Sequence, residues 1–193
     1  ISLGLVGSEM CIRDSLESGR VRMEISSLSL GDVIDRAILA TTSLSSDANA
    51  RITKALHQPD IRIETDGDRL AQALINLLTN AIRHNDKSVP EVLVSTQDVT
   101  LQKTRRLVIN VQDNGPGIPA RNREVIFEKF ASIPSRAGGK GVGLGLPITR
   151  QIINKLDGKL SFLSNDDGSV FRIELPLTLT HQLETPADTG THQ

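Results

Sequence analysis

Two asparagines four residues apart are the first residues in this sequence whose type and spacing could support chemistry. Asn76 and Asn80 lie in QALINLLTNAIRHN, and on a helix they would share one face with Arg69, Gln72 and Arg83. Amide oxygens can ligate Mg²⁺, which takes few protein ligands and keeps phosphates and waters in its shell. The alternative is a solvated polar face, although asparagine is a mediocre helix former.

Two glycine-containing motifs could complete a nucleotide site. DNGPGI, residues 113–118, follows a predicted strand; Asp113 could accept a hydrogen bond from an exocyclic amine while the glycines let the backbone approach a ligand. A plain Asx-type turn is the alternative. GGKGVGLGL, residues 138–146, runs into a predicted helix, where unpaired N–H groups suit a polyphosphate. It matches neither a P-loop nor the dinucleotide pattern, and a flexible linker is its alternative.

The elements that must position these motifs follow from hydrophobic periodicity and start signals. The predicted helices are 28–46, 67–84, 121–130 and 144–156, and the predicted strands are 50–56, 61–65, 91–96, 106–112, 159–164 and 170–175, with a polar connection at 98–104 and a Gly-rich loop at 131–143. Mostly antiparallel strand pairs interspersed with helices predict an α+β fold, a two-layer α/β sandwich with about three helices on one face of a mixed sheet.

Composition limits the classes of function. The 193 residues carry 22 Lys+Arg and 23 Asp+Glu, and a net charge of −1 gives no support for nucleic-acid binding or direct membrane contact. No apolar run approaches the ~20 residues of a membrane span. The single Cys11 excludes an internal disulfide framework.

Four motifs in a fixed order identify a family resemblance. NLLTNA, DNGPGI, IFEKF and GVGLGL resemble the N, G1, F and G2 boxes of the histidine-kinase ATPase superfamily, which also includes gyrase, MutL and heat-shock chaperone ATPases. Upstream, LESGRVRMEISSLSLGDVI resembles the segment that leads from a kinase dimerisation domain into the ATPase domain. The chain thus resembles the ATP-binding catalytic domain of a sensor histidine kinase, which implies a Bergerat-type fold.

The resemblance also implies a site for ATP and Mg²⁺. Asn80 would coordinate Mg²⁺, Asn76 would line the same catalytic phosphate site, Arg83 and His84 would lie near the phosphates and the nucleotide, and Asp113 would accept the adenine amino group. The base pocket would comprise Gly115, Gly117, Ile118 and Ser169. The lid hinge would comprise Phe127 and Phe130. The phosphate loop would comprise Lys140, Gly141, Val142, Gly143, Leu144, Gly145 and Leu146.

Two positions bear on which branch of the superfamily applies. ATP-hydrolysing branches carry a Glu at the place of Asn76 as general base, and an amide cannot take that proton at neutral pH. This favours a protein histidine kinase. Many kinases have an aromatic–Arg pair after the F box, where Ala131 and Ser132 stand here, so Lys129, Arg136 or Lys140 would have to supply that charge. A nucleotide-binding interaction module and a gyrase- or chaperone-type clamp therefore stay open as alternatives.

The phosphoacceptor is expected to lie outside this chain, because none of the four histidines, His57, His84, His181 and His192, lies in an H-E-x-x-x-P motif. Expected partners are ATP, a histidine-bearing dimerisation domain and a response-regulator receiver domain, in the cytoplasm. The expected division is a non-native or unstructured segment 1–15, the end of the dimerisation-domain connection 16–30, the catalytic domain 31–177 and a disordered tail 178–193.

Overall fold

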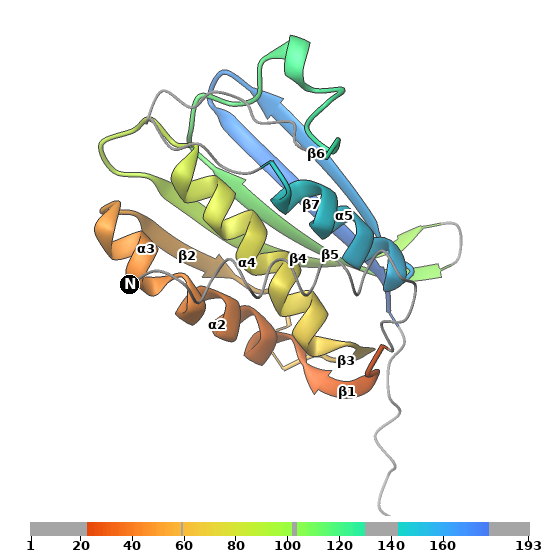
Figure 1. Cartoon of the computed structure of the whole chain (residues 1–193). Helices are drawn as coiled ribbons and strands as arrows, with labels where there is room; N and C mark the ends of the chain where they lie inside the picture. Colours follow the sequence, from red (N-terminus) through yellow and green to blue (C-terminus); the bar gives the residue numbers. More distant parts are fainter. Residues whose placement is uncertain (1–22, 59, 102–103, 130–142, 178–193) are drawn as a thin grey trace, which may run out of the picture.

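The computed structural model describes residues 23–58, 60–101, 104–129 and 143–177. Helices cover one face of a five-stranded sheet with the order β2-β4-β5-β7-β6 (Figure 1). β2 (Arg51–Ala55) runs parallel to β4 (Glu91–Leu101), and the other neighbours are antiparallel. The expected α+β sandwich with a mixed, mostly antiparallel sheet is therefore confirmed, although four helices, not three, lie within the described residues.

The N-terminal part departs from the single helix predicted over residues 28–46, and that prediction is wrong. β1 (Ser26–Ser29) pairs with β3 (Arg62–Thr65) and is followed by α2 (Leu30–Ala40) and α3 (Thr42–Asp47). Ser29 caps α2 through its side chain, and the Thr41 hydroxyl bonds to the Ile38 carbonyl at 2.9 Å, where α2 ends. Pairing with a distant strand and a competing side-chain bond both override the helical periodicity.

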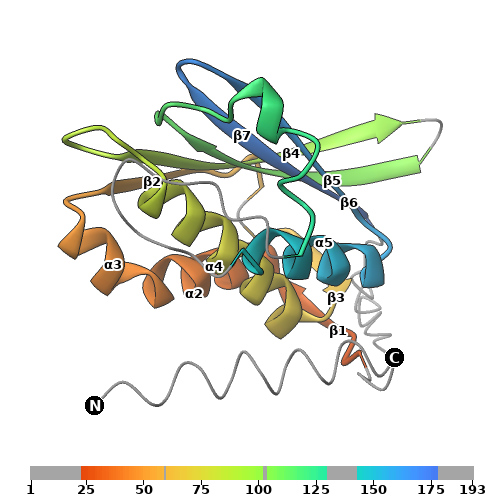
Figure 2. The same ribbon diagram turned by 45° about the horizontal axis from the view of Figure 1, so that its top comes forward.

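Helix α4 (Gly67–Arg83) confirms the prediction of a helix over residues 67–84 to within one residue. The Asp66 side chain accepts a hydrogen bond from Arg69 N at 3.0 Å, which satisfies an otherwise unpaired helix N–H. Its apolar residues recur every three or four positions and are buried, among them Leu70, Leu74, Leu77, Leu78 and Ala81. α4 packs between α2 and α5 (Gly145–Lys155) on one face of the sheet (Figure 2).

The central hairpin is longer than predicted. β4 and β5 (Thr104–Asp113) pair from Val92–Asp113 to Leu101–Thr104, so most of the polar stretch 98–104 is strand, not connection. Within it Thr100 is exposed, and Asp98 pairs with Arg105 across the hairpin. β7 (Gly168–Pro176) and β6 (Lys159–Asn165) complete the sheet. The face under the helices is apolar and buried, with Val92, Val94, Leu107, Ile109, Val111, Phe171, Ile173 and Leu175.

The helix predicted over residues 121–130 is also wrong for the residues described. A single 3-10 turn, η1 (Ala120–Asn122), is followed by turns up to Lys129. Arg123 donates from Nε to Ile118 O at 3.0 Å and from Nη2 to Ser164 O at 2.8 Å. These hydrogen bonds accompany an irregular backbone in a segment whose local propensity favours a helix.

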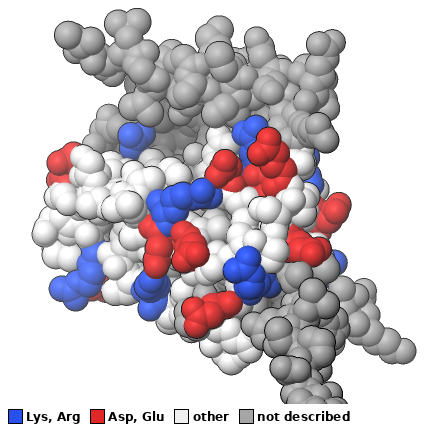
Figure 3. Space-filling view, turned by 90° about the horizontal axis from the view of Figure 1, so that it is seen from below, with Lys and Arg blue, Asp and Glu red and all other residues white. Residues whose placement is uncertain are grey.

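Two features of the molecule are the distribution of charged side chains on its surface and the length of its apolar helices. Acidic and basic side chains are interspersed on the face in Figure 3, in keeping with the net charge of −1. None of the described helices is long and apolar enough to span a bilayer.

Candidate nucleotide-binding site

The two asparagines of α4 lie against the start of α5. Asn76 Nδ2 donates to Gly145 O at 3.4 Å and to Thr149 Oγ1 at 3.3 Å. Asn80 is half-buried, and its side chain has no hydrogen-bond partner among the described residues. A β-carbon added to Gly145 would lie 3.8 Å from Asn80 Nδ2 and 3.9 Å from Oδ1. The structure therefore brings the predicted amide pair and the end of the Gly-rich motif together, with one amide available to a ligand.

The first turn of α5 offers donors toward the same place. Its N-cap residue Leu144 provides no side-chain cap, so, within the part of the chain that the structure describes, the N–H groups of Gly145 and Leu146 are left for a ligand or water. Gly143, just before them, has φ +69°, a conformation that favours glycine. A half-buried amide beside uncapped helix N–H groups fits a magnesium-bound phosphate, because Mg²⁺ takes few protein ligands and the N–H groups suit an anion.

The end of α4 carries the predicted basic and ring residues. Arg83 occupies the last turn and His84 is the C-cap, its N–H donating to Asn80 O at 3.0 Å. His84 keeps exposed surface, yet desolvation by the surrounding protein and the adjacent Arg83 charge lower the pKa of its ring below 6.5. Both effects favour the neutral form of the imidazole.

Asp113 is the last residue of β5, and only one of its two carboxylate oxygens accepts hydrogen bonds from the described residues. Oδ1 accepts from Gly115 N at 2.9 Å and from Ser169 N at 3.3 Å, whereas Oδ2 has no partner among the described residues. Burial raises the pKa of Asp113 above 3.8, and the two backbone hydrogen bonds oppose that rise. The carboxylate is thus oriented by backbone and presents one free acceptor.

Gly117 lies against the protein's own backbone. At φ +69°, a β-carbon there would lie 1.7 Å from Asn165 O, at the end of β6 where the chain turns into β7. The close backbone approach is therefore to the protein's own chain, and it locks the 113–118 loop onto that turn. Gly115 has less room than it needs for a side chain as well, since its β-carbon would meet Asp113 Oδ1 at 3.0 Å.

The motifs are joined by polar residues that sequence reasoning missed. Asn85, directly after α4, donates from Nδ2 to Asn114 Oδ1 at 2.9 Å and so connects the helix to the 113–118 loop. Thr149 is fully buried and donates to Gly145 O at 2.8 Å. Ser164 accepts from Ile118 N at 2.6 Å and lies 3.0 Å from Ser169 Oγ. Asn85 and Asn114 are 29 residues apart, and Ile118 and Ser164 are 46 apart, so no spacing in the sequence links these partners.

The F box is described only in part. Phe127 packs edge-on against Phe162 at 5.9 Å between ring centroids, and the Arg150 guanidinium lies 5.4 Å from the Phe127 centroid. This arrangement ties the predicted hinge residue to β6 and α5. Phe130, Lys140, Gly141 and Val142, together with segments 1–15 and 178–193, lie outside the described residues.

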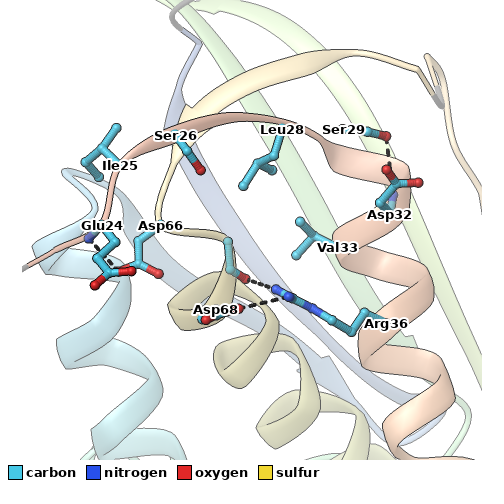
Figure 4. Close-up of a pocket in the computed structure, with 11 residues that line it drawn as sticks. Glu24, Ile25, Ser26, Leu28, Ser29, Asp32, Val33, Arg36, Asp66 and Asp68 are labelled. Carbon is cyan, nitrogen blue, oxygen red and sulfur yellow. Dashed lines mark hydrogen bonds and ion pairs between the residues drawn. The ribbon is translucent and has the colours of Figure 1, made fainter.

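A separate cleft lies at the other end of α4. Its volume is 390 Å³ and its lining includes Leu28, Arg36 and Asp66 (Figure 4). Arg36 donates to Gly67 O at 2.6 Å and pairs with Asp68 at 2.8 Å, so its charge is already committed. Fourteen residues of helix separate Asp66 from Asn80, about 20 Å along the axis. The cleft is therefore not part of the site at the C-terminal half of α4.

Comparison with known proteins decides the family. A family described as "Histidine kinase-, DNA gyrase B-, and HSP90-like ATPase" matches residues 65–179. The chain belongs to this family. Sensor protein KdpD of Escherichia coli (strain K12) is 32% identical over 171 residues, which cover 88% of this chain and 18% of the length of KdpD.

Solved histidine kinases share the fold of this family member. The catalytic domain of histidine kinase ThkA matches at 28% identity and a TM-score of 0.67, covering 82% of this chain and 100% of that structure. ThkA in complex with response regulator protein TrrA matches at 26% identity and a TM-score of 0.68, covering 90% and 48%. The resemblance to sensor histidine kinase catalytic domains is confirmed, and neither the interaction-module nor the clamp alternative gains support.

Proposed function

We propose that this domain binds Mg²⁺·ATP and transfers the γ-phosphoryl group to a histidine on a dimerisation domain outside this chain, from which a response-regulator receiver domain takes it. The domain has the histidine-kinase catalytic fold, and its relatives include Sensor protein KdpD and the histidine kinase ThkA. Because ATP and receiver domains meet in the cytoplasm, the domain would act there.

The observation that carries the proposal is the free oxygen of Asp113. A half-buried carboxylate whose Oδ1 is held by two backbone N–H groups has a fixed direction, and its open Oδ2 can accept a hydrogen bond from the adenine amino group. A donor at this point recovers part of the cost of burying the charge. The 113–118 loop, locked by Gly117, would form one wall of the base pocket.

The phosphates would lie between α4 and the start of α5. Asn80 would ligate Mg²⁺ through its amide oxygen, and the N–H groups of Gly145 and Leu146 would face the phosphate oxygens. Mg²⁺, when bound, would neutralise charge on the transferred group. Arg83 would add positive charge beside it, so catalysis would consist of positioning and charge stabilisation.

Asn76 makes transfer more favourable than hydrolysis. Its Nδ2 is engaged with Gly145 O and Thr149 Oγ1, and an amide at this place cannot deprotonate an attacking water. The bound nucleotide would therefore persist until a histidine is presented. Of the histidines within the described residues, His57 is exposed between β2 and β3, and His84 ends α4.

Calorimetric titration with a non-hydrolysable ATP analogue, with and without Mg²⁺, tests the proposal. Calorimetry is chosen because the chain has no Trp or Tyr whose fluorescence could report binding. We expect micromolar binding that Asp113→Asn weakens at least tenfold, about 1.4 kcal/mol. Asp166→Asn, an exposed acid in the turn between β6 and β7, is the matched control and should bind normally. Asn80→Ala should abolish the Mg²⁺ enhancement. Failure of the folded wild-type domain to bind the analogue would refute the proposal.

A further inference from the structure

Asn114 and Gly115 form the only Asn-Gly pair in the sequence, and such a pair can modify itself. The backbone nitrogen of the glycine attacks the side-chain Cγ of the asparagine, and the glycine has no β-carbon to hinder the approach. The new N–Cγ bond closes a succinimide ring. The Cγ–Nδ2 bond breaks, and Nδ2 leaves as ammonia with the hydrogen of the glycine N–H. Water then opens the ring to aspartate or isoaspartate.

Hydrogen bonds hold both reacting groups of this pair in the folded domain. The Asn114 Oδ1 atom accepts from Asn85 Nδ2 and from Glu91 N, each at 2.9 Å. The Asn114 backbone N–H donates in return to Glu91 O at 3.2 Å. The attacking nitrogen is engaged elsewhere, because Gly115 N–H donates to Asp113 Oδ1 at 2.9 Å. The amide and its nucleophile are therefore bound to different partners, and the reaction requires these bonds to break.

Backbone groups fix the orientation of both side-chain amides. A backbone N–H can only donate, so the atom of Asn114 that faces Glu91 N is the oxygen. Lys87 N–H donates to Asn85 Oδ1 at 3.0 Å, which leaves the Asn85 nitrogen to face Asn114. Asn85 is buried, with 7% of its surface exposed, so water has little access to replace this donor. The Asn85–Asn114 bond therefore persists until the end of α4 and the 113–118 loop separate.

We propose that Asn114 is a latent modification site, which forms a succinimide when the 113–118 loop opens and which Asn85 keeps unreactive in the folded domain. The rate would follow the population of the open loop, since local opening precedes the chemistry. Isoaspartate at this position would route the backbone through the former side chain and lengthen it next to Asp113. The inference goes beyond the proposed function, because the covalent change is measured without nucleotide.

Mass spectrometry during incubation under mildly alkaline conditions measures the reaction. Conversion of asparagine to aspartate or isoaspartate raises the mass, and peptide mapping locates the change. We expect modification at Asn114 to be slow in folded wild type and roughly tenfold or more faster in guanidinium chloride, where these hydrogen bonds are absent. Asn85→Asp keeps an acceptor for Lys87 N–H but has no hydrogen for Asn114. It should accelerate modification of the folded chain by about fivefold, the effect of one neutral hydrogen bond.

A control variant separates the loss of this bond from a general loss of stability. Asp66→Ala removes the side-chain cap of α4 at the opposite end of that helix, and it should lower stability without accelerating modification at Asn114. Asn85→Ala, which adds no charge, replaces Asn85→Asp if that variant does not fold. An unaltered rate in a folded Asn85 variant would overturn the inference. Equal rates in folded and unfolded wild type would overturn it as well, and that comparison needs no variant.

Discussion

Replacing Gly117 by alanine tests whether the 113–118 loop is held by backbone contact. The added β-carbon would lie 1.7 Å from Asn165 O, and the residue would have to keep a φ of +69°. The left-handed conformation costs a non-glycine residue about 1–2 kcal/mol, and overpacking costs roughly 1–3 kcal/mol. Relief of the clash would stretch the 2.6 Å bond between Ile118 N and Ser164 Oγ. We expect a total loss of about 2–5 kcal/mol in the free energy of unfolding.

Thermal and urea unfolding followed by far-ultraviolet circular dichroism measure this loss, with nucleotide titration alongside. For a chain of this size, the loss corresponds to a decrease in Tm of roughly 5–15 °C. ATP affinity should fall at least tenfold, because the loop that carries Asp113 is displaced. A Tm equal to that of wild type would refute the reasoning, since it would mean that the loop and the β6–β7 turn can separate without cost.

Gly145→Ala is the matched control for Gly117→Ala. Its β-carbon would lie no closer than 3.8 Å to the Asn80 side chain, and alanine favours a helix over glycine by about 0.5–1 kcal/mol. Stability should be unchanged or slightly raised, whereas ATP affinity should fall because the methyl group occupies the proposed phosphate side of α5. Unaltered ATP binding would contradict this placement of the phosphates.

Two further predictions concern the carboxylates of Asp66, which is buried, and Asp113, which is half-buried. Asp66→Ala removes bonds to Arg69 N and Glu24 N, both 3.0 Å, and should cost about 2–3 kcal/mol in urea unfolding, whereas Asp68→Ala, an exposed ion-pair partner, should cost less than about 1 kcal/mol. Because burial raises the pKa of Asp113, the folded state binds more protons than the unfolded state above pH 3.8, and stability falls as pH rises through that window. Asp113→Asn should therefore be at least as stable as wild type at neutral pH, and any advantage should shrink in acid; a deficit that is largest at neutral pH would contradict this.

The local sequence pattern predicted those helices and strands whose buried face depends only on residues within the same segment. The apolar repeat of α4 and the capping Asp66 are contained in about five turns of chain, and both the helix and its polar stripe appear as expected. The end of strand β5 at Asp113 and the turn at 114–118 are likewise predicted by the local glycine and proline residues. The family resemblance added roles for Asn80 and Asp113 that periodicity alone could not supply.

Prediction failed where a distant segment competes with local preference. The helix predicted over 28–46 begins later because residues 26–29 pair with residues 62–65, and nothing within residues 28–46 reveals that partner. The helix predicted over 121–130 is replaced by turns where Arg123 reaches Ser164, 41 residues away. Hydrophobic periodicity measures which face is apolar, and it carries no information about such polar pairings.

The sequence by itself therefore determined the family, the helix α4, the strands β2 to β7 and the residue types proposed to face the nucleotide, because these depend on motifs and periods read along the chain. Only the tertiary structure decided how the site is held: that Gly117 makes room for the Asn165 backbone, that Asn85 ties α4 to the loop, and that Ser164 stands behind Ser169. Each of these is a contact between segments 29 or more residues apart or across a strand register, and such contacts exist only once the chain is folded.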